Sequence, residues 1–402
     1  MDGISEKTEK SALRKRAWGF GFVGILSYTT GYVVRYLLSV SQPAMLETGA
    51  YSAGFLGVLS ALLLISYAAG QLVSGFLGDA IRARYMVLIG LSATGLSNIV
   101  FSFTHLAWLQ AACFVVMGLS LSMLRGPITK MISESLDKDR AQFICTLLFV
   151  FSHLGPLIAS MLALIFRWQR LFLYAGCFTL CVGIFAFFAI TSFEKKGWIS
   201  FRASQRTGFV AYKGLFRIDG FVFFMIIGGV TEIANTAITF WLPTYFSDAL
   251  ALSESTAQLL NSVAAILNTV APFVTLMVYR LIKKRETYLL RGAFPISILS
   301  FVAMIFVPGV LPKIILLLVG KTGLSFSAAV LWSIYIPSMG ATGRVSSISG
   351  VIVCAGYIAA AAATFTFGQF AGANWTVVLS IWAGIAVVGF VAACIRKQKQ
   401  PE

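Results

Sequence analysis

The feature that most constrains this chain is a series of twelve apolar stretches, each of about 20 residues or more. A stretch of this length can cross a bilayer as a helix, and the runs are continuous rather than alternating, which argues against barrel strands. Only helices satisfy their own backbone polar groups inside lipid. The sequence therefore predicts an all-α membrane protein with twelve transmembrane helices. The expected spans cover residues 17–45, 51–78, 84–104, 106–130, 141–166, 171–192, 218–246, 254–282, 288–309, 311–336, 344–370 and 374–395.

The basic residues predict how the spans are oriented. Only 11% of the residues are charged, and most of the 31 Lys and Arg fall in one alternate set of loops and in the two tails. Because cytoplasmic loops carry an excess of Lys and Arg, we expect both termini in the cytoplasm. The net charge of +16 predicts no nucleic-acid partner, since the basic residues are dispersed along the membrane surface. The first span is too long for a cleaved leader, which favours a bacterial inner (plasma) membrane.

The longest loop between the expected spans, residues 193–217, is basic and divides them into six and six. We expect a tail at 1–16, a six-helix bundle at 17–192, a linker at 193–217, a second bundle at 218–395 and a tail at 396–402. Two pseudosymmetric halves of this kind are typical of secondary transporters, which bind substrate near mid-membrane where the repeats meet. We expect such a carrier to be a monomer.

The loop between the second and third spans carries a motif. Residues 75–84 read GFLGDAIRAR, which resembles the loop signature of the major facilitator superfamily: Gly, any residue, Leu, a small residue, Asp and then basic residues. The glycine permits close helix approach, and the Asp with a nearby Arg can form a charge relay at helix ends. The alternative is an ordinary tight turn with positive-inside arginines. The matching positions, which we assign to gating, are Gly75, Leu77, Asp79 and Arg84, whereas Ala80, Arg82 and Ala83 depart from the signature.

A weaker resemblance, spread over most of the chain, is to the organophosphate:phosphate antiporters. The pieces that carry it are Tyr32-x-x-Arg35 with Pro43, Trp241-x-Pro243-Thr244-Tyr245, and Ser349-Gly350 with Gly356-Tyr357. The resemblance implies that arginines on helices 1 and 7 hold phosphate. Arg35 matches the first of these, but Asn235 stands at the second, and Gln71 stands near the position of a helix 2 lysine. The implied phosphate clamp is therefore incomplete.

Three ionisable residues lie well inside expected spans: Arg35, Glu232 and Lys321. Such a residue costs at least about 2.5 to 3.5 kcal/mol near the bilayer centre, so it normally faces a partner or a wet cavity. Arg35 either lines a cavity, where it can hold phosphate or carboxylate, or snorkels to the headgroups. Lys321 is either an anion or proton site or part of a structural ion pair. Glu232 either exchanges protons or neutralises Lys321 or Arg35.

Two further titratable residues have competing interpretations. Arg125 precedes Gly126 and Pro127 near the expected cytoplasmic end of the fourth span. We expect it to bind backbone carbonyls or headgroups there, with the lower part of the cavity as the alternative. The phosphate carriers have a cavity histidine on helix 5, which makes His153 a candidate for proton coupling. Counting along the span displaces His153 by about half a turn, so a structural role is equally supported.

Together these residues predict a substrate of negative charge. Arg35 and Lys321 outweigh Glu232, so we expect a secondary active transporter that moves a small organic anion, phosphorylated or carboxylated, by alternating access. A proton or a counter-anion would be the coupled ion. The residues expected to add hydrogen bonds are Tyr32, Gln71, Asn235 and Asn268.

Two other functions stay open. One is a proton-coupled exporter of amphipathic compounds that uses Glu232 as its proton site, and the other is a transporter-like membrane sensor. An enzyme is not expected, because the sequence contains no HExxH, nucleophile elbow or Gly-rich phosphate loop in a strand-helix context. No cofactor is implied, and six cysteines without CxxC spacing or a His cluster predict no metal site.

Overall fold

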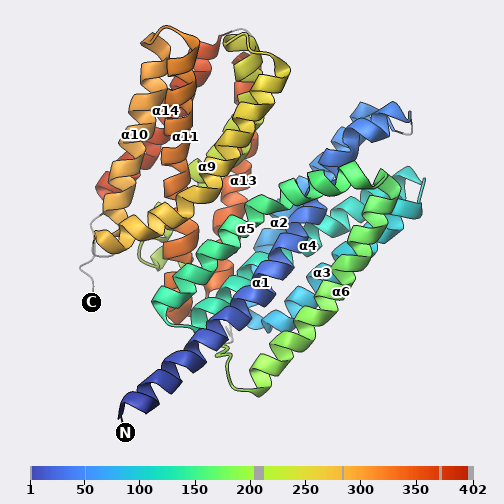
Figure 1. The fold of residues 1–402 in the computed structure, drawn as a ribbon, viewed down its shortest axis with the longest axis vertical. Helices are drawn as coiled ribbons and strands as arrows, with labels where there is room; N and C mark the ends of the chain where they lie inside the picture. Colours follow the sequence, from blue (N-terminus) through green and yellow to red (C-terminus); the bar gives the residue numbers. More distant parts are fainter. Residues whose placement is uncertain (1, 50, 203–211, 283–284, 371–373, 397–402) are drawn as a thin grey trace. The chain divides into compact units, whose positions relative to one another are not determined.

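A computed structural model describes residues 2–49, 51–202, 212–282, 285–370 and 374–396 (Figure 1). Every regular element in this described part is helical, which confirms the predicted all-α fold. The first half contains α1 (Asp2–Glu47), α2 (Ala53–Ala80), α3 (Ala83–Phe103), α4 (Ala107–Ser135), α5 (Lys138–Ile165) and α6 (Trp168–Lys195). These bounds lie within a few residues of the expected spans, except that α1 begins at Asp2 and α4 continues to Ser135.

The second half is helical too, but several of its spans are built from consecutive pieces. The seventh span joins α7 (Phe221–Glu232), η3 (Ile233–Ile238), α8 (Thr239–Thr244) and η4 (Tyr245–Ala249), and a short η2 (Leu215–Arg217) precedes it. The tenth joins α11 (Val310–Ala329), η5 (Val330–Tyr335), α12 (Ile336–Ser338) and η6 (Met339–Thr342). The other helices are α9 (Glu254–Leu281), α10 (Glu286–Phe306), α13 (Val345–Phe370) and α14 (Trp375–Ile395).

The segments η3, η4 and η5 are π-helical. A π-helix adds a residue to the turn and re-aims the side chains that follow it, and such segments occur frequently at functional sites. Both spans that contain them also contain a titratable residue singled out above, Glu232 or Lys321. The apolar pattern of the sequence predicted continuous α-helices here, because a shift to longer hydrogen bonds leaves that pattern almost unchanged.

The chain divides into two compact units. The first contains Met1–Lys213 together with Ile336–Val351, and the second contains Gly214–Tyr335 together with Ile352–Glu402. In the first unit α3 packs on α6, α2 on α4 and α1 on α5, and α1 to α6 are drawn from blue to green in Figure 1. Gly95 and Gly176 bring α3 and α6 together, because a Cβ on either glycine would lie within 2.8 Å of the other's carbonyl oxygen. In the second unit α10 packs between α11 and α14.

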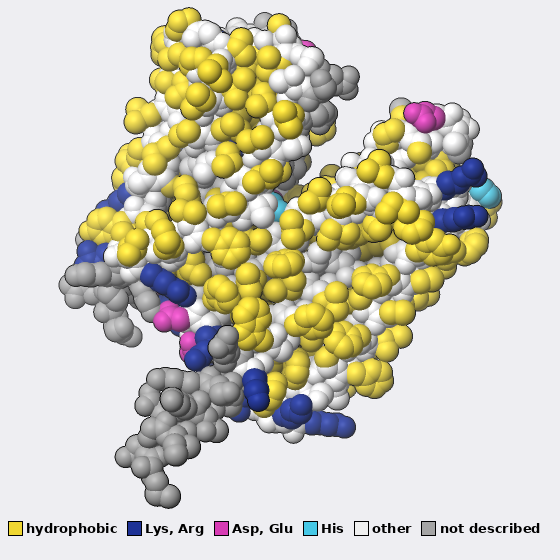
Figure 2. Space-filling model, in the orientation of Figure 1, with side chains coloured by type: hydrophobic (Ala, Val, Ile, Leu, Met, Phe, Trp, Pro, Cys, Tyr) yellow, Lys and Arg dark blue, Asp and Glu magenta, His cyan; other side chains and the backbone are white. Residues whose placement is uncertain are grey.

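The outer surface is apolar. Among the described residues, eleven helical segments are long and apolar enough to cross a membrane, and α1 is a further long helix. Figure 2 shows hydrophobic side chains over the flanks of the helices, and residues such as Leu164 (89% exposed) and Phe306 (77% exposed) point outward. An apolar outer surface on helices long enough to cross a bilayer is stabilised by contact with lipid. The protein is therefore integral to a membrane.

Candidate functional site

Arg35 lies in a small pocket inside the first unit. The pocket is lined by tyrosine and leucine side chains of α1, α2 and α4, and the lining residues are Tyr28, Gly31, Tyr32, Arg35, Tyr67, Leu121 and Leu124. The Arg35 guanidinium carbon lies 4.4 Å from the Tyr67 ring centre and 5.7 Å from that of Tyr32. Contacts of this length are cation–π interactions, which attract a cation to the face of an aromatic ring. They place the Arg35 guanidinium among side chains of α1 and α2.

Arg125 joins the same group of tyrosines from α4. Its guanidinium carbon lies 6.0 Å from the ring centre of Tyr28. The hydroxyl of Tyr28 donates a hydrogen bond to that of Tyr32 at 3.3 Å, and the two ring centres are 4.9 Å apart. Because α4 continues to Ser135, about 15 Å of helical rise separates Arg125 from the end of its helix. The expected position near the end of the span assumed a helix that was too short.

Gln71 and His153 are placed differently from the arginines. Gln71 is buried on α2, and a Cβ on Gly350 would lie 2.3 Å from its carbonyl oxygen, so α13 passes against α2 at this point. His153 places Nδ1 2.8 Å from the carbonyl oxygen of Phe149, one turn earlier on α5, and packs edge-on against the Phe149 ring. A bond to the residue's own helix is typical of a structural histidine, and the proton-coupling role of His153 stays a prediction.

In the second unit, Glu232 is the last residue of α7 and is 8% exposed. Gly356 of α13 makes room for it, since a Cβ there would lie 2.5 Å from the Glu232 Cγ. Asn235 lies in the π-helical η3 that follows. Lys321 is only 3% exposed on α11, and its Nζ makes no hydrogen bond or ion pair with any other described residue. A Glu232–Lys321 ion pair, one of the expected alternatives, is therefore not formed in the described part of the chain.

Lys321 has polar neighbours along its helix. One turn after it, the Ser325 hydroxyl donates hydrogen bonds to the Lys321 carbonyl at 3.0 Å and to the side-chain oxygen of Asn268 on α9. Asn268 and Ser325 are both buried. Asn268, one of the hydrogen-bonding residues expected from the sequence, thus contacts α11 one turn after Lys321.

The loop motif lies in a second polar group of the first unit. The Asp79 carboxylate accepts hydrogen bonds from the backbone N–H groups of Ser346 at 3.0 Å and Ser347 at 2.9 Å, in the first turn of α13. Helix N-termini expose such donors and favour a negative charge. Gly78 and Gly126 leave space for Ser346, because a Cβ on either would lie within 2.3 Å of the Ser346 hydroxyl oxygen.

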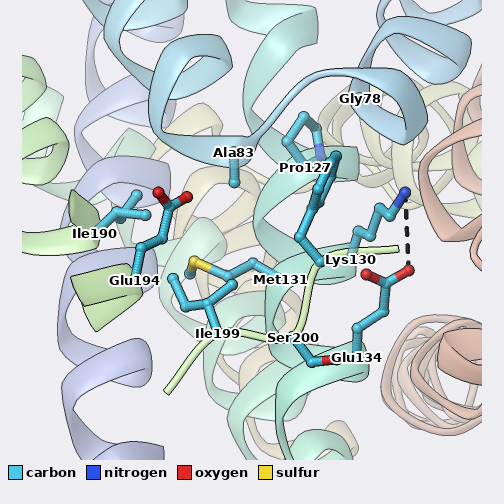
Figure 3. Close-up of a pocket in the computed structure, with 11 residues that line it drawn as sticks. Gly78, Ala83, Pro127, Lys130, Met131, Glu134, Ile190, Glu194, Ile199 and Ser200 are labelled. Atoms are coloured by element: carbon cyan, nitrogen blue, oxygen red, sulfur yellow. Dashed lines mark ion pairs between the residues drawn. The ribbon is translucent and has the colours of Figure 1, made fainter. Parts of the chain in front are cut away.

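Lys130 completes this group. Its Nζ donates to the carbonyl oxygens of Asp79 at 2.8 Å, Arg202 at 2.9 Å and Gly343 at 3.1 Å. It also lies 3.4 Å from the Asp79 carboxylate and 3.7 Å from that of Glu134, the ion pair drawn in Figure 3. We call Asp79, Lys130, Glu134 and the first turn of α13 the Asp79–Lys130 cluster.

Lys130 was not predicted from the sequence, because it stands where the fourth span was expected to end and resembles one more positive-inside lysine. Glu134, four residues later, could have identified Lys130 as one partner of an ion pair, because an acid and a base at this spacing lie on one face of a helix. Arg84, which matched the motif, instead binds Glu194 of α6 at 2.8 Å, and Arg82 binds the same carboxylate at 3.0 Å.

The start of the linker also contacts the Asp79–Lys130 cluster. The Arg202 backbone N–H donates to the Glu134 carboxylate at 3.1 Å, and the Arg202 guanidinium donates to the Ala341 carbonyl at 3.2 Å. The Phe201 ring centre lies 5.0 Å from the Lys130 Nζ. Ile199 and Ser200 line the small pocket between α4 and α6 that Figure 3 shows. Residues 203–211 of the linker lie outside the described residues.

Known proteins resemble the chain both in sequence and in fold. The Membrane sensor protein UhpC of Escherichia coli (strain K12) is 30% identical over 164 residues, which cover 40% of this chain and 37% of UhpC. The Phosphoglycerate transporter protein of Salmonella typhimurium is 32% identical over 106 residues (26% of this chain, 22% of the relative). The Glucose-6-phosphate exchanger SLC37A2 of Bos taurus is 20% identical over 240 residues (48% and 49%). The chain spans half or less of the length of these relatives.

The similarity of fold extends over almost the whole chain. The outward conformation of the transporter FucP superimposes with a TM-score of 0.74 at 14% identity, covering 94% of this chain and 99% of FucP. The human organic anion transporter MFSD10 gives a TM-score of 0.68 at 15% identity, covering 94% and 99%. A family model, described as the Major Facilitator Superfamily, matches residues 24–364. The resemblance inferred from the loop motif is thereby confirmed, and the chain belongs to the Major Facilitator Superfamily.

Proposed function

We propose that the protein is a secondary transporter that moves a small phosphorylated organic anion by alternating access. The observation that carries the proposal is the Arg35 pocket, which presents a guanidinium and three tyrosines inside the first unit. A guanidinium binds phosphate or carboxylate through two parallel hydrogen bonds, and tyrosine hydroxyls can both donate and accept. Relatives named for glucose 6-phosphate exchange and phosphoglycerate transport support the phosphorylated class.

The Asp79–Lys130 cluster supports the alternating-access part of the proposal. It joins α2 and α4 to residues 343–347, which are more than 200 positions away in the chain, through hydrogen bonds between buried groups. A transporter needs contacts that hold one state and can break as a unit when the halves rock. Polar contacts suit this role, because each partner can be hydrated after separation. We infer that the cluster closes one side of the transport path.

Several further parts of the proposal rest on the sequence. The basic loops support cytoplasmic termini, and the bacterial relatives UhpC and the phosphoglycerate transporter support an inner membrane. Either a counter-anion or a proton would drive uptake. Exchange for inorganic phosphate needs only the Arg35 pocket, whereas proton coupling would use Glu232.

The experiment is exchange in proteoliposomes. Vesicles loaded with inorganic phosphate are given labelled glucose 6-phosphate or 3-phosphoglycerate outside, with and without a proton gradient. We expect uptake that requires internal phosphate or the gradient, and loss of at least about 90% of it in Arg35→Ala, since a charge-assisted bond contributes on the order of 1.5 to 3 kcal/mol. The matched control is Arg140→Ala, which removes an arginine whose partner is Asp137 at the start of α5.

The second candidate function is a membrane sensor. It is favoured by UhpC, which is named as a membrane sensor and is 30% identical over the matched residues. A sensor would bind phosphorylated ligands to the same pocket without moving them. Binding of a phosphorylated ligand to the purified protein, combined with no uptake in vesicles, would therefore select the sensor. Uptake of amphipathic cations with no response to phosphate esters would instead select the proton-coupled exporter.

A further inference from the structure

We propose that a groove between α1, α5 and α6 binds an anionic phospholipid, with an acyl chain in the groove and the headgroup phosphate at Arg167 and Arg170. The groove lies in the first unit and shares no lining residue with the Arg35 pocket. The proposal concerns a lipid and not a transported substrate, so it goes beyond the proposed function and does not depend on it.

The groove is formed where α5 and α6 both pack against α1, and Figure 1 shows α1 between them. Its volume is about 440 Å³, which falls within the range of about 300 to 1,000 Å³ that small-molecule sites occupy. Each helix lines it with residues three or four positions apart, which lie on one face of a helix. These residues include Ile158, Leu162 and Phe166 on α5, and Leu171, Tyr174 and Phe178 on α6.

The wall of the groove suits an apolar ligand. Two threonines in the wall bond within the protein, because the Thr29 hydroxyl donates to the Phe151 carbonyl at 3.4 Å and the Thr179 hydroxyl donates to the Ala175 carbonyl at 2.6 Å. The remaining wall is mainly aliphatic and aromatic, and Phe178 is 56% exposed on the apolar flank of α6. Such a wall offers few hydrogen bonds to a polar substrate, whereas an acyl chain gains van der Waals contacts along it.

Two arginines stand at one end of the groove. The turn between α5 and α6 joins two spans, so it lies at the level of the lipid headgroups, and Figure 2 shows basic side chains at this end of the first unit. Arg170 precedes Tyr174 by four residues and Arg167 precedes Leu171 by four, so both continue the groove-lining face of α6 by one turn. Both are exposed, and neither guanidinium has a hydrogen bond, an ion pair or a ring contact with another described residue.

The arginines and the groove together indicate an anionic phospholipid. A guanidinium forms charge-assisted hydrogen bonds to a phosphate, and basic pockets between transmembrane helices bind phospholipid headgroups. A zwitterionic headgroup carries its own cation beside the phosphate, so two arginines favour a headgroup with net negative charge. Next to the arginines, Phe166 and Tyr174 pack edge to face with ring centres 5.3 Å apart, which is the kind of aromatic contact found at a membrane interface.

The test compares phosphatidylglycerol with phosphatidylcholine that has the same acyl chains. Their affinities for the purified full chain in a neutral detergent would be measured by native mass spectrometry. We expect phosphatidylglycerol to bind at least about tenfold more tightly, which is within what two basic residues near a membrane surface contribute. The double variant Arg167→Gln/Arg170→Gln should lose this preference. The matched control, Arg217→Gln/Arg280→Gln, removes two exposed arginines of the second unit and should keep it.

The groove itself is tested with added bulk. Ala175→Trp fills it from α6 and Leu162→Trp fills it from α5, so each should weaken the binding of both lipids at least about tenfold. Cys177→Trp adds a similar bulk to the exposed face of α6 outside the groove and should leave both affinities unchanged. The two groove variants come from different helices, so a folding defect in one of them, seen as a lower melting temperature without lipid, does not decide the test.

Three results would overturn the lipid site. Equal affinity of the wild type for the two lipids, or a preference that survives in Arg167→Gln/Arg170→Gln, would show that the arginines do not bind the headgroup. A preference lost equally in Arg217→Gln/Arg280→Gln would reduce the effect to the net charge of the protein. Unchanged lipid binding in both groove variants would show that no acyl chain occupies the groove. None of these results bears on phosphate binding at Arg35, which is measured with soluble ligands.

Discussion

The Asp79–Lys130 cluster and the Arg35 pocket lie in the same unit, and both contain buried or half-buried charge, but their charges are satisfied in different ways. In the cluster, Asp79 receives two backbone N–H groups and Lys130 donates to three carbonyl oxygens and lies near two carboxylates. In the pocket, Arg35 and Arg125 lie over tyrosine rings. Hydrogen bonds and ion pairs among buried groups stabilise a conformation, whereas the role proposed for the pocket is to bind a ligand. Substitutions should therefore affect stability in the first region and binding in the second.

The largest loss of stability is expected for Asp79→Ala. Asp79 is 1% exposed and Lys130 is 2% exposed, so the substitution removes a carboxylate that lies 3.4 Å from a buried ammonium and leaves two backbone N–H groups in the first turn of α13 without their acceptor. Breaking one partner of a buried pair costs about 3 to 5 kcal/mol. We expect a fall in the melting temperature of the purified protein large enough to lower its yield. An unchanged melting temperature would show that the cluster does not hold this conformation.

The same cluster can be tested by adding atoms instead of removing charge. A Cβ on Gly126 would lie 2.2 Å from the Ser346 hydroxyl oxygen, so Gly126→Ala forces Ser346 to shift. Overpacking of this kind costs about 1 to 3 kcal/mol. Ser346→Ala removes the atom that collides and should restore part of the melting temperature in the double variant. If the double variant is no more stable than Gly126→Ala alone, the contact between α4 and α13 is not the cause of the loss.

The positions of the spans could be predicted from the sequence, but the contacts of the Asp79–Lys130 cluster could not. The positions of the spans follow from the length of the apolar runs, so α3 was expected at 84–104 and is found at Ala83–Phe103. Asp79 was identified because its loop motif is local in sequence. Its partners were not, because backbone N–H groups at Ser346 and Ser347 have no side-chain signature and come from a segment more than 260 residues away.

The pocket was predicted less completely than the cluster. Arg35 was singled out because a charge within a span is rare. Arg125 was assigned to the end of a helix, because the polar residues after Pro127 suggested an end near residue 130. They remain helical since Thr129, Lys130 and Ser133 are buried in the first unit, not exposed at a membrane surface. The length of a helix that continues beyond its apolar part is decided by such tertiary contacts, which one sequence does not reveal.

The smallest effect on stability is expected in the pocket, and it is the sharpest test of the difference between the two regions. Arg35→Met removes a charge that costs about 2.5 to 3.5 kcal/mol near the bilayer centre. It also removes two cation–π contacts, which contribute about 0.5 to 2 kcal/mol each. Because these contributions are opposite in sign, the melting temperature without ligand should fall less than that of Asp79→Ala, while stabilisation by phosphorylated ligands is lost. A fall as large as that of Asp79→Ala would mean that Arg35 is a structural residue, and the distinction between a complete cluster and a ligand pocket would then fail.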